Sequence, residues 1–327
     1  MKCLNEESIS KSSKISISGE LKEKLTRWHS SDYEILSSTD DISEIYDKIK
    51  SEIGKEIINK EHPFKNGKLP VNMQANRYIN ILPLEETRVI LNNYKEYGLK
   101  TDYINANHVS FDKNQTQYIL TQGPKLTTLI AFWLMIWEQN VSVIVMLTKR
   151  WERGREKCIH YWPEKDPIHI HSLTITLFNE KPLNEHIYHR KFKMTYKKED
   201  EIVEERIVHH LFYSEWSDFG IPNDPTNILK LCSLTTKIDK KARSLSENPS
   251  KILVHCSAGV GRSGTFVSIH NIMEEIEQTK LLDFDIPKTL SILRKQRDQA
   301  VQTLEQFAFI YTAVAGGILS KSFEESD

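Results

Sequence analysis

One short stretch of the chain combines a thiol, a guanidinium and small residues in a spacing that suits chemistry on a phosphate. Cys256 and Arg262 frame a Cys-x5-Arg pattern, and Ser263 follows directly. The thiolate is the nucleophilic form of cysteine, and a positive field favours it. Arg262 could hold two phosphate oxygens bidentately, which lysine cannot match. The pattern predicts a phosphate-binding site with Cys256 held as the attacking thiolate, and Ser263 is close enough in sequence to stabilise that thiolate when it leaves.

The residues between Cys256 and Arg262 have the character of an anion-binding loop. A short apolar run, 252–254, leads in and an amphipathic helix follows, so backbone N–H groups would gather at a helix N-terminus. A buried cysteine before a glycine-rich turn is the alternative, and the full string disfavours it. A Walker nucleotide loop is excluded because no Gly-Lys-Ser/Thr follows. The expected phosphate-binding residues are Ser257, Ala258, Gly259, Val260, Gly261 and Arg262.

The elements that must position this loop follow from apolar periodicity. The nearly continuous apolar run 141–147 predicts a strand covered on both faces, and the alternation over 169–177 predicts a half-exposed strand. Helical stripes occur at 42–49, 132–136, 266–276, 286–294 and 307–318. Strands interleaved with helices predict an α/β fold, a single domain with a central twisted mixed β-sheet flanked by helices.

Composition sets the domain boundaries and the expected surroundings of the protein. Residues 1–30 are rich in Ser, Lys and Glu and predict a flexible N-terminal tail, followed by one domain at 31–319 and a C-terminal tail at 320–327. The 44 basic and 45 acidic residues argue against nucleic acid as the main partner. No run of 18 apolar residues predicts a membrane span, and the start of the chain lacks a secretory core.

The cysteines and histidines show no pattern of a metal site. Cys3, Cys158, Cys232 and Cys256 are scattered without a CxxC pair, so free thiols in a reducing, cytoplasmic location are expected. His169 and His171 could share one strand face and bind a metal. Without a third ligand at sensible spacing, surface histidines are favoured. We therefore expect neither a metal nor another cofactor.

The string from Val254 to Gly264 resembles the signature loop of the protein tyrosine phosphatases, and the resemblance extends over about 35–319. It implies the cysteine phosphatase fold and hydrolysis of phosphotyrosine in proteins. Cys256 would form a phosphocysteine intermediate, which water then hydrolyses. The implied partners are tyrosine-phosphorylated proteins, and we expect the chain to act as a monomer.

Two further segments supply the groups that a thiolate alone lacks. A leaving tyrosyl oxygen needs a proton, and the segment from Trp216 to Pro222 resembles the family's mobile acid loop, normally Trp-Pro-Asp. Asp218 would be the acid and then the base that activates water, although Ser217 replaces the usual proline. The segment 301–307 resembles the glutamine segment, in which Gln302 would place the water with help from Gln306 on the same face of a helix start.

The segment 76–81 resembles the loop that recognises phosphotyrosine. Tyr78 would stack on the substrate ring and make the pocket too deep for phosphoserine. Two departures from the family are present: Ala75 replaces a lysine, and Asn80 replaces the aspartate that holds the peptide backbone. An asparagine accepts a hydrogen bond without charge, so peptide docking is expected to be weaker or differently selective.

The remaining matches are supporting ones. Glu152 and Lys157 match a loop of the family whose Glu and Lys help to position Arg262 and Asp218. A solvated charged loop is an equal alternative for these two residues. His255 and Trp216 flank the catalytic residues and are expected to support them. Segments 102–107, 121–124 and 132–138 resemble core segments of the family. A basic stretch could steer phosphate inward or be plain charged surface; it comprises Lys149, Arg150, Arg153, Arg155 and Lys157.

Two rival functions remain from this sequence. One is a catalytically weak phosphotyrosine-binding module that sequesters substrates, which the presence of Cys256, Arg262 and Asp218 disfavours. The other is a dual-specificity or lipid phosphatase, which Tyr78 disfavours. A compact chain without an SH2 module, membrane span or tandem domain also resembles, more narrowly, the polydnavirus (bracovirus) tyrosine phosphatases of parasitoid wasps. That resemblance implies action in the cytoplasm of infected host cells, where the protein would suppress tyrosine-kinase signalling.

Overall fold

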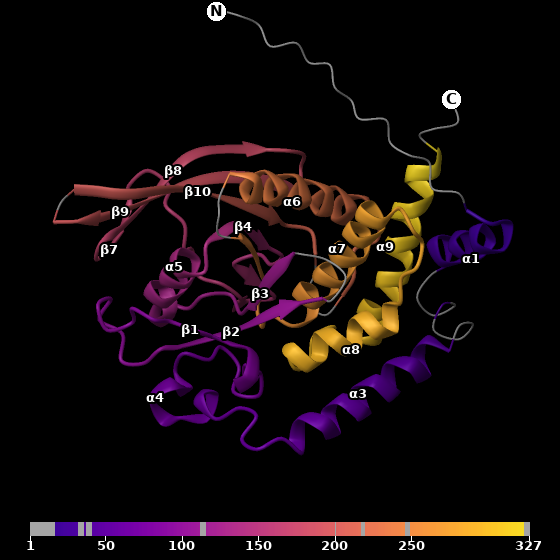
Figure 1. Ribbon diagram of the computed structural model, residues 1–327, viewed down its shortest axis with the longest axis horizontal. Helices are drawn as coiled ribbons and strands as arrows, with labels where there is room; N and C mark the ends of the chain where they lie inside the picture. Colours follow the sequence, from indigo (N-terminus) through magenta and orange to yellow (C-terminus); the bar gives the residue numbers. More distant parts are fainter. Residues whose placement is uncertain are drawn as a thin grey trace, which may run out of the picture.

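The computed structural model describes residues 17–31, 36, 41–111, 116–199, 201–216, 220–245 and 249–323, with the side chains of 322 and 323 excepted. The fold is organised around one nine-stranded sheet in the order β1-β2-β3-β11-β4-β10-β9-β8-β7, with helices on both sides (Figure 1). The strands are β1 Arg88–Ile90, β2 Tyr103–Ser110, β3 Gln117–Thr121, β4 Val141–Met146, β7 Ile168–Ile170, β8 Leu173–Pro182, β9 Ile187–Lys198, β10 Glu201–Tyr213 and β11 Lys251–His255.

The centre of the sheet is parallel and its two sides are antiparallel. β11 runs parallel to both β3 and β4, and β4 runs parallel to β10. Every residue of β4 is buried, as the predicted strand covered on both faces requires. The predicted α/β fold with a mixed sheet and flanking helices is therefore confirmed, and the Cys256 loop leaves from the central strand.

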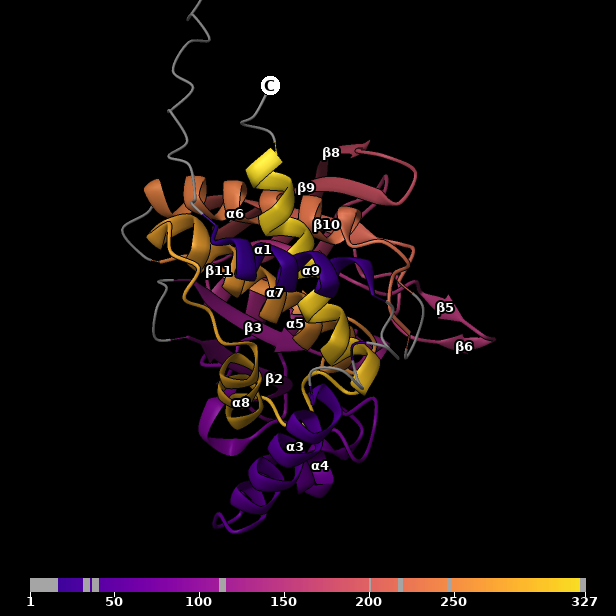
Figure 2. The ribbon, with the colours of Figure 1, turned by 90° about the vertical axis from the view of Figure 1, so that its right-hand side faces the viewer.

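Helices cover the two faces of the sheet and divide the core. One hydrophobic cluster joins Phe266, Ile269 and Phe307 to the sheet, and a second joins Phe132 and Trp133 to its other face. Figure 2 shows α6, α7 and α9 stacked side by side. The helices are α1 Gly19–Ser30, α3 Ile42–Ile58, α4 Pro70–Met73, α5 Leu129–Glu138, α6 Thr226–Ser244, α7 Gly261–Thr279, α8 Ile286–Gln296 and α9 Leu304–Phe323, with short 3-10 turns at Asn66–Lys68, Glu85–Thr87 and Leu126–Thr128.

The predicted boundaries of the two tails are wrong. Residues 19–30 form the helix α1, which Ser18 caps by accepting a hydrogen bond from the N–H of Leu21. Trp28 is buried and meets the ring of Tyr311 on α9 edge to face at 4.9 Å. At the other end, α9 continues to Phe323. Leu21, Leu25 and Trp28 follow one another at four and three residues, which is helical spacing within a polar stretch, and the contact of Trp28 with α9 distinguishes this packed helix from a solvated tail.

The predicted single strand over 169–177 is two strands. β7 ends at Ile170 and β8 begins at Leu173, and the two pair as a hairpin. His171 lies between them with φ of 48°, the left-handed conformation that tight turns use. His169 is therefore on β7 and His171 in the turn, rather than on one strand face. Alternating apolar residues on both sides of a two-residue turn imitate one continuous strand.

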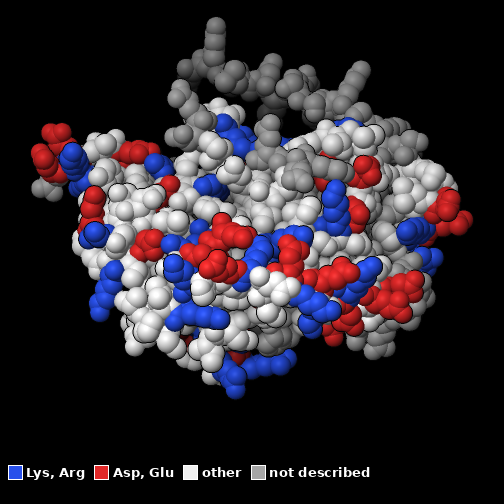
Figure 3. Space-filling model, turned by 60° about the horizontal axis from the view of Figure 1, so that its bottom comes forward, with Lys and Arg blue, Asp and Glu red and all other residues white. Residues whose placement is uncertain are grey.

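Surface charge is mixed on the face that Figure 3 presents, where Lys and Arg alternate with Asp and Glu. This agrees with the formal net charge of -1. No helix among the described residues has the length and apolar character needed to cross a membrane.

The core contains a histidine whose burial makes stability depend on pH. His270 on α7 is fully buried between the hydroxyls of Tyr118 and Thr236, and burial lowers its pKa from 6.5 to about 4 despite the nearby carboxylate of Glu274. Between these two values the unfolded chain binds a proton that the folded chain excludes. The contribution of neutral His270 to the free energy of unfolding is therefore fully present above pH 6.5, and it is lost as the pH falls toward 4.

We therefore expect His270→Gln to flatten the acid side of the stability profile. Glutamine can still hydrogen-bond both hydroxyls but binds no proton. Between pH 6.5 and pH 5 its unfolding free energy should fall by about 1–2 kcal/mol less than that of the wild type, measured by urea denaturation. The control is His169→Gln, which changes an exposed histidine on β7. Equal acid slopes in all three proteins would contradict the assignment.

Candidate active site

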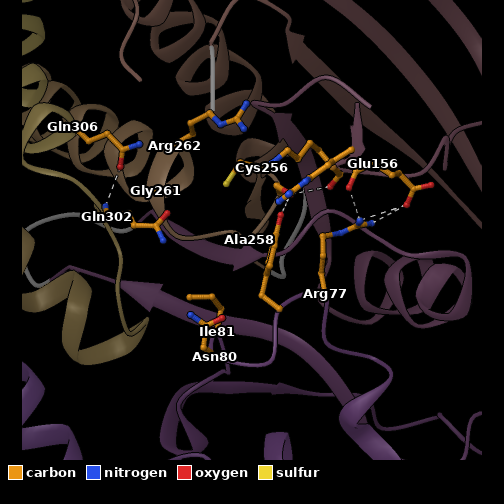
Figure 4. Close-up of a pocket in the computed structure, with 14 residues that line it drawn as sticks. Arg77, Asn80, Ile81, Glu156, Cys256, Ala258, Gly261, Arg262, Gln302 and Gln306 are labelled. Carbon is orange, nitrogen blue, oxygen red and sulfur yellow. Dashed lines mark hydrogen bonds and ion pairs between the residues drawn. The ribbon is translucent and has the colours of Figure 1, made fainter. Parts of the chain in front are cut away.

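The loop that follows β11 lines a cavity of about 360 Å³. Cys256 lies at its base and is only 4% exposed. Figure 4 shows Gln302 and Gln306 on one side of Cys256, and Arg77 with Glu156 on the other. The lining also includes predicted residues of the loop and of the recognition segment, namely Tyr78, Asn80, Lys157, Ser257, Ala258, Gly261 and Arg262. The fold thus brings four predicted segments, 76–81, 152–157, 256–262 and 302–306, to one cavity.

The carbonyl groups of the loop are turned away from the cavity by donors outside it. The Ser257 carbonyl accepts from the N–H of Gly123, and the Val260 carbonyl accepts from the N–H of Val301. Arg297 donates to the two carbonyls between them, from Nη2 to Ala258 and from Nε to Gly259. In a trans peptide the C=O and the next N–H point in opposite directions. The N–H groups of 258–261 therefore face the cavity, which makes it an anion cradle.

Gly259 is required by the shape of this cradle. Its φ is +71°, and a Cβ there would lie 2.1 Å from the carbonyl oxygen of Thr121. Its N–H donates to the sulfur of Cys256 at 3.2 Å, so the loop already stabilises negative charge on that atom. Any side chain at this position would force the loop away from β3.

Gly259→Ala should destabilise the protein by about 2–5 kcal/mol, because it combines the left-handed penalty with a steric overlap. Denaturant unfolding measures the change. Gly54→Ala is the matched control: Gly54 lies inside α3 with nothing within 4 Å of an added Cβ, so alanine should stabilise by about 0.5–1 kcal/mol. A Gly259→Ala protein as stable as the wild type would refute the close approach to Thr121.

Arg262 is held at the cavity by a buried carboxylate and two carbonyls. Its Nη1 and Nη2 donate to the two carboxylate oxygens of Glu152 at 2.8 and 2.9 Å, and the two side chains are 2% and 10% exposed. Nη1 also donates to the carbonyls of Leu147 and Trp216. The predicted contact between Glu152 and Arg262 is therefore present, and the alternative of a solvated charged loop is wrong for Glu152. This clamp fixes the plane of the guanidinium.

Trp216 links this clamp to the start of the predicted acid loop. Its ring is buried against Phe309, and its Nε1 donates to the carbonyl of Gly220 at 3.0 Å. Ser217 and Asp218 lie outside the described residues, so the predicted acid is not placed. The contacts of Trp216 bring the two described ends of that loop together.

Ser263 is buried, and its hydroxyl makes no hydrogen bond to any described residue. It lies in the first turn of α7, directly after Arg262, but its Oγ does not bond the sulfur of Cys256 in this conformation. A buried hydroxyl without a partner costs about 1–3 kcal/mol. Its predicted role toward the leaving thiolate remains a prediction, and the unused donor is compatible with it.

The recognition segment forms one wall of the cavity. The hydroxyl of Tyr78 lies 2.8 Å from the Oγ of Ser257, so the tyrosine side chain reaches down to the loop. Arg77 pins the segment by donating to the carbonyls of Gly123 and Pro124. Asn80 is exposed at the rim. Tyr78 therefore forms a wall of the cavity that extends down to the loop, and its stacking on a substrate ring stays a prediction.

The opposite wall comes from the segment before α9. Gln302 lies two residues before this helix rather than on its face, and its N–H donates to the side chain of the buried Gln306 at 2.9 Å. Val301 has φ of 57°, a strained value for a β-branched residue. Its carbonyl accepts from Tyr46 and from Arg294, which hold the strained peptide. This strain brings Gln302 to the cavity.

A network of hydrogen bonds among buried side chains supports the backbone of Cys256. The Nδ1 of His255 lies 3.2 Å from the carbonyl of Cys256, which can only accept, so Nδ1 is the donor. Burial lowers the pKa of His255 to about 4, so its Nε2 is free to accept from the hydroxyl of Tyr161 at 2.8 Å. His210 meets the same hydroxyl at 2.8 Å. These neutral groups orient the peptide of Cys256.

Sequence reasoning missed several of these supports. Arg297 is fully buried, and its Nη1 donates to the side chain of Asn107 while the rest of its guanidinium holds the loop. Burial lowers the pKa of Arg297 to about 10. The position of Arg297 shortly before the glutamine segment 301–307 was the one sequence signal that could have pointed to a role at the site. For Tyr161 and His210 we find no signal in the sequence, because neither lies near a motif.

No group of three or more potential metal ligands occurs among the described residues. His169 bonds the hydroxyl of Thr174, and His171 packs on the ring of Tyr97. What the cavity offers instead is a thiol, a clamped guanidinium and inward N–H groups. This set can bind a phosphoryl group and attack it without a metal ligand.

Comparison with known proteins agrees with this chemistry. The profile of the protein-tyrosine phosphatase family matches residues 72–316. Human tyrosine-protein phosphatase non-receptor type 18 is 38% identical over 252 residues, which are 76% of this chain and 52% of that protein. Human receptor-type tyrosine-protein phosphatase epsilon is also 38% identical over 252 residues, 76% of this chain and 35% of the relative. The chain thus spans about half or less of the length of these relatives.

Solved structures extend the match to three dimensions. The catalytic domain of human protein tyrosine phosphatase non-receptor type 18 has a TM-score of 0.76 and 34% identity, with 88% of this chain and 100% of that chain covered. A structure of PTPN18 in complex with HER2 phosphopeptides has a TM-score of 0.75 and 34% identity, with 84% and 99% covered. The resemblance read from the Cys256 loop is thereby confirmed at the level of the family: the chain belongs to the protein-tyrosine phosphatase family.

Proposed function

We propose that this chain hydrolyses phosphotyrosine in proteins through a phosphocysteine intermediate. The observation that carries the proposal is the cradle around Cys256, in which the N–H of Gly259 meets the sulfur and Glu152 clamps Arg262. The cradle supplies positive charge where a phosphoryl group would sit and where negative charge would develop in the transition state.

The proposed first step transfers the phosphoryl group to sulfur. The thiolate of Cys256 attacks phosphorus and the bond to the tyrosyl oxygen breaks. Asp218 gives its proton to that oxygen, so tyrosine leaves neutral. Arg262 and the N–H groups of Ala258 to Gly261 hold the three equatorial oxygens.

The proposed second step returns the enzyme to its starting form. Gln302, steadied by its bond to Gln306, places a water molecule on the phosphocysteine. Asp218, now a carboxylate, takes a proton from the water as the water oxygen bonds to phosphorus, the sulfur–phosphorus bond breaks and inorganic phosphate leaves. Ser263, whose buried hydroxyl bonds no described residue, would donate to the sulfur as it leaves.

Substrate choice follows from the walls of the cavity. The side chain of Tyr78 extends from the rim to Ser257 and makes the pocket deep. An aryl phosphate can reach Cys256 across this depth, whereas phosphoserine and a phosphoinositide head group are expected to fit poorly. Human PTPN18, a relative of this chain, is known in complex with phosphopeptides, which supports tyrosine-phosphorylated proteins as partners.

Turnover of p-nitrophenyl phosphate and of a phosphotyrosine peptide tests the proposal. We expect hydrolysis of both without added metal, and rates on the matching phosphoserine peptide and on phosphoinositides that are lower by orders of magnitude. Binding of the phosphotyrosine peptide without any turnover would instead support a substrate-sequestering module. Comparable rates on all substrates would support a dual-specificity or lipid phosphatase.

We further propose a cytoplasmic, monomeric enzyme that suppresses tyrosine-kinase signalling. For the site of this action we propose infected host cells, on the basis of the narrower resemblance of the sequence to bracovirus phosphatases. Substrate capture from insect cell lysates by the Cys256→Ser protein would identify the phosphotyrosine proteins concerned.

A further inference from the structure

The basic stretch of the sequence folds into a hairpin beside the cavity. Its strands are β5 Trp151–Glu152 and β6 Arg155–Glu156, and Figure 2 shows them projecting from the body of the molecule. The hairpin divides its cations between two hollows. Lys149 and Arg153 line a hollow of about 310 Å³ outside the active-site cavity, whereas the exposed Arg155 and the buried Lys157 line the active-site cavity itself.

The base of Arg155 is fixed because both strands of the hairpin are anchored. Glu152 on β5 holds Arg262 through two hydrogen bonds. Glu156 on β6 pairs with Arg77, and the N–H of Lys157 donates to the carbonyl of Arg150 at 2.8 Å. The backbone of Arg155 is therefore held in place, and its guanidinium moves at the mouth of the cavity only by rotation of its side chain.

The charge of Arg155 is not neutralised within the described part of the chain. The residue is exposed and forms no ion pair there. The two carboxylates nearest to it along the hairpin are already engaged, Glu152 by Arg262 and Glu156 by Arg77. Among the residues that line the cavity, Arg155 is thus a cation at the rim with its charge available to a ligand.

The recognition segment places an uncharged, exposed residue at the rim of the same cavity. Asn80 stands at the rim where the family is expected to have an aspartate, and its carbonyl accepts from the side chain of Gln299 at 3.0 Å. A carboxylate at this position would repel an acidic peptide. An uncharged amide does not, so Arg155 adds an exposed positive charge at the rim to those of Arg77, Lys157 and Arg262 deeper in the cavity lining.

We propose that Arg155 selects phosphotyrosine sites that carry a glutamate or aspartate within two residues of the phosphotyrosine. An extended peptide advances about 3.3 Å per residue, so side chains this close to the phosphotyrosine stay within reach of an arginine at the rim. The inference rests on the proposed phosphatase function and adds the determinant of its sequence preference. Arg155 acts on the peptide and not on the reacting atoms.

Matched phosphotyrosine peptides test this assignment. One peptide carries glutamate at the two residues on each side of the phosphotyrosine, and its partner carries glutamine there. The readout is the ratio of kcat/KM for the two peptides. An exposed ion pair predicts a wild-type ratio of about two- to fivefold in favour of glutamate. Arg155→Gln should bring the ratio close to one, and Arg155→Glu should invert it.

Arg153→Gln is the control, because it removes the same charge from the same hairpin but from the neighbouring hollow. It should keep the wild-type ratio, and the wild-type preference should shrink as salt is raised. Retention of the preference in Arg155→Glu, or its equal loss in Arg153→Gln, would overturn the role of Arg155. Equal wild-type rates on both peptides would also overturn it and leave the phosphatase function intact. Hydrolysis of neither peptide would instead count against the proposed function.

Discussion

Replacing Cys256 with serine is expected to lower turnover of p-nitrophenyl phosphate by about 10⁴-fold or more, while the protein stays folded. A serine hydroxyl needs an adjacent general base to become a nucleophile. The hydrogen bond to the Cys256 sulfur comes from the N–H of Gly259, which is a donor and cannot take a proton. The loop and Arg262 remain in place, so the variant should still bind phosphotyrosine peptides.

Three measurements separate loss of the nucleophile from loss of the fold. Thermal unfolding should shift by only a few degrees, calorimetry should detect peptide binding, and steady-state kinetics should detect no turnover. Cys232→Ser is the control, because it makes the same change at a buried cysteine on α6. That variant should retain turnover. A Cys256→Ser protein within tenfold of wild-type turnover would disprove covalent catalysis by this residue.

Arg262→Lys is expected to lower kcat/KM by about 10²–10³-fold. The guanidinium makes two bonds to Glu152 and two to the carbonyls of Leu147 and Trp216. A single ammonium group cannot keep this geometry and also hold two phosphate oxygens. It would leave Glu152 partly unsatisfied in a buried site, so the free energy of unfolding should also fall by about 1–3 kcal/mol.

The kinetic loss must be measured where the variant is folded, which urea denaturation establishes. Arg206→Lys makes the same exchange on β10, where the guanidinium stacks on Trp137 at 3.9 Å and bonds its carbonyl. This control should lose some stability and keep its kcat/KM. Arg262→Lys with wild-type kcat/KM would mean that Arg262 serves structure alone.

The local chemistry and the mixed, largely buried sheet with its flanking helices were predictable from the chain alone. The buried runs that became β4 and β11, and the stripe that became α7, needed only periodicity. The hairpin turn at His171 and the helix α1 were missed for a physical reason. A turn residue with φ of 48° has no unique sequence, and α1 owes its burial to α9, which is distant along the chain.

The candidate site likewise has a part that local sequence spacing predicts and a part that depends on long-range contacts. Cys256, Arg262 and the small residues between them lie within seven positions, so their spacing alone implies a phosphate cradle. Arg297, which holds that cradle, is itself bonded to Asn107, 190 positions away in the chain, and Glu152 bonds Arg262 across 110 positions. Such contacts depend on the order of strands in the sheet, and no local pattern encodes that order. Tertiary structure alone decided which carbonyls of the loop are held outward, and therefore that its N–H groups face the substrate.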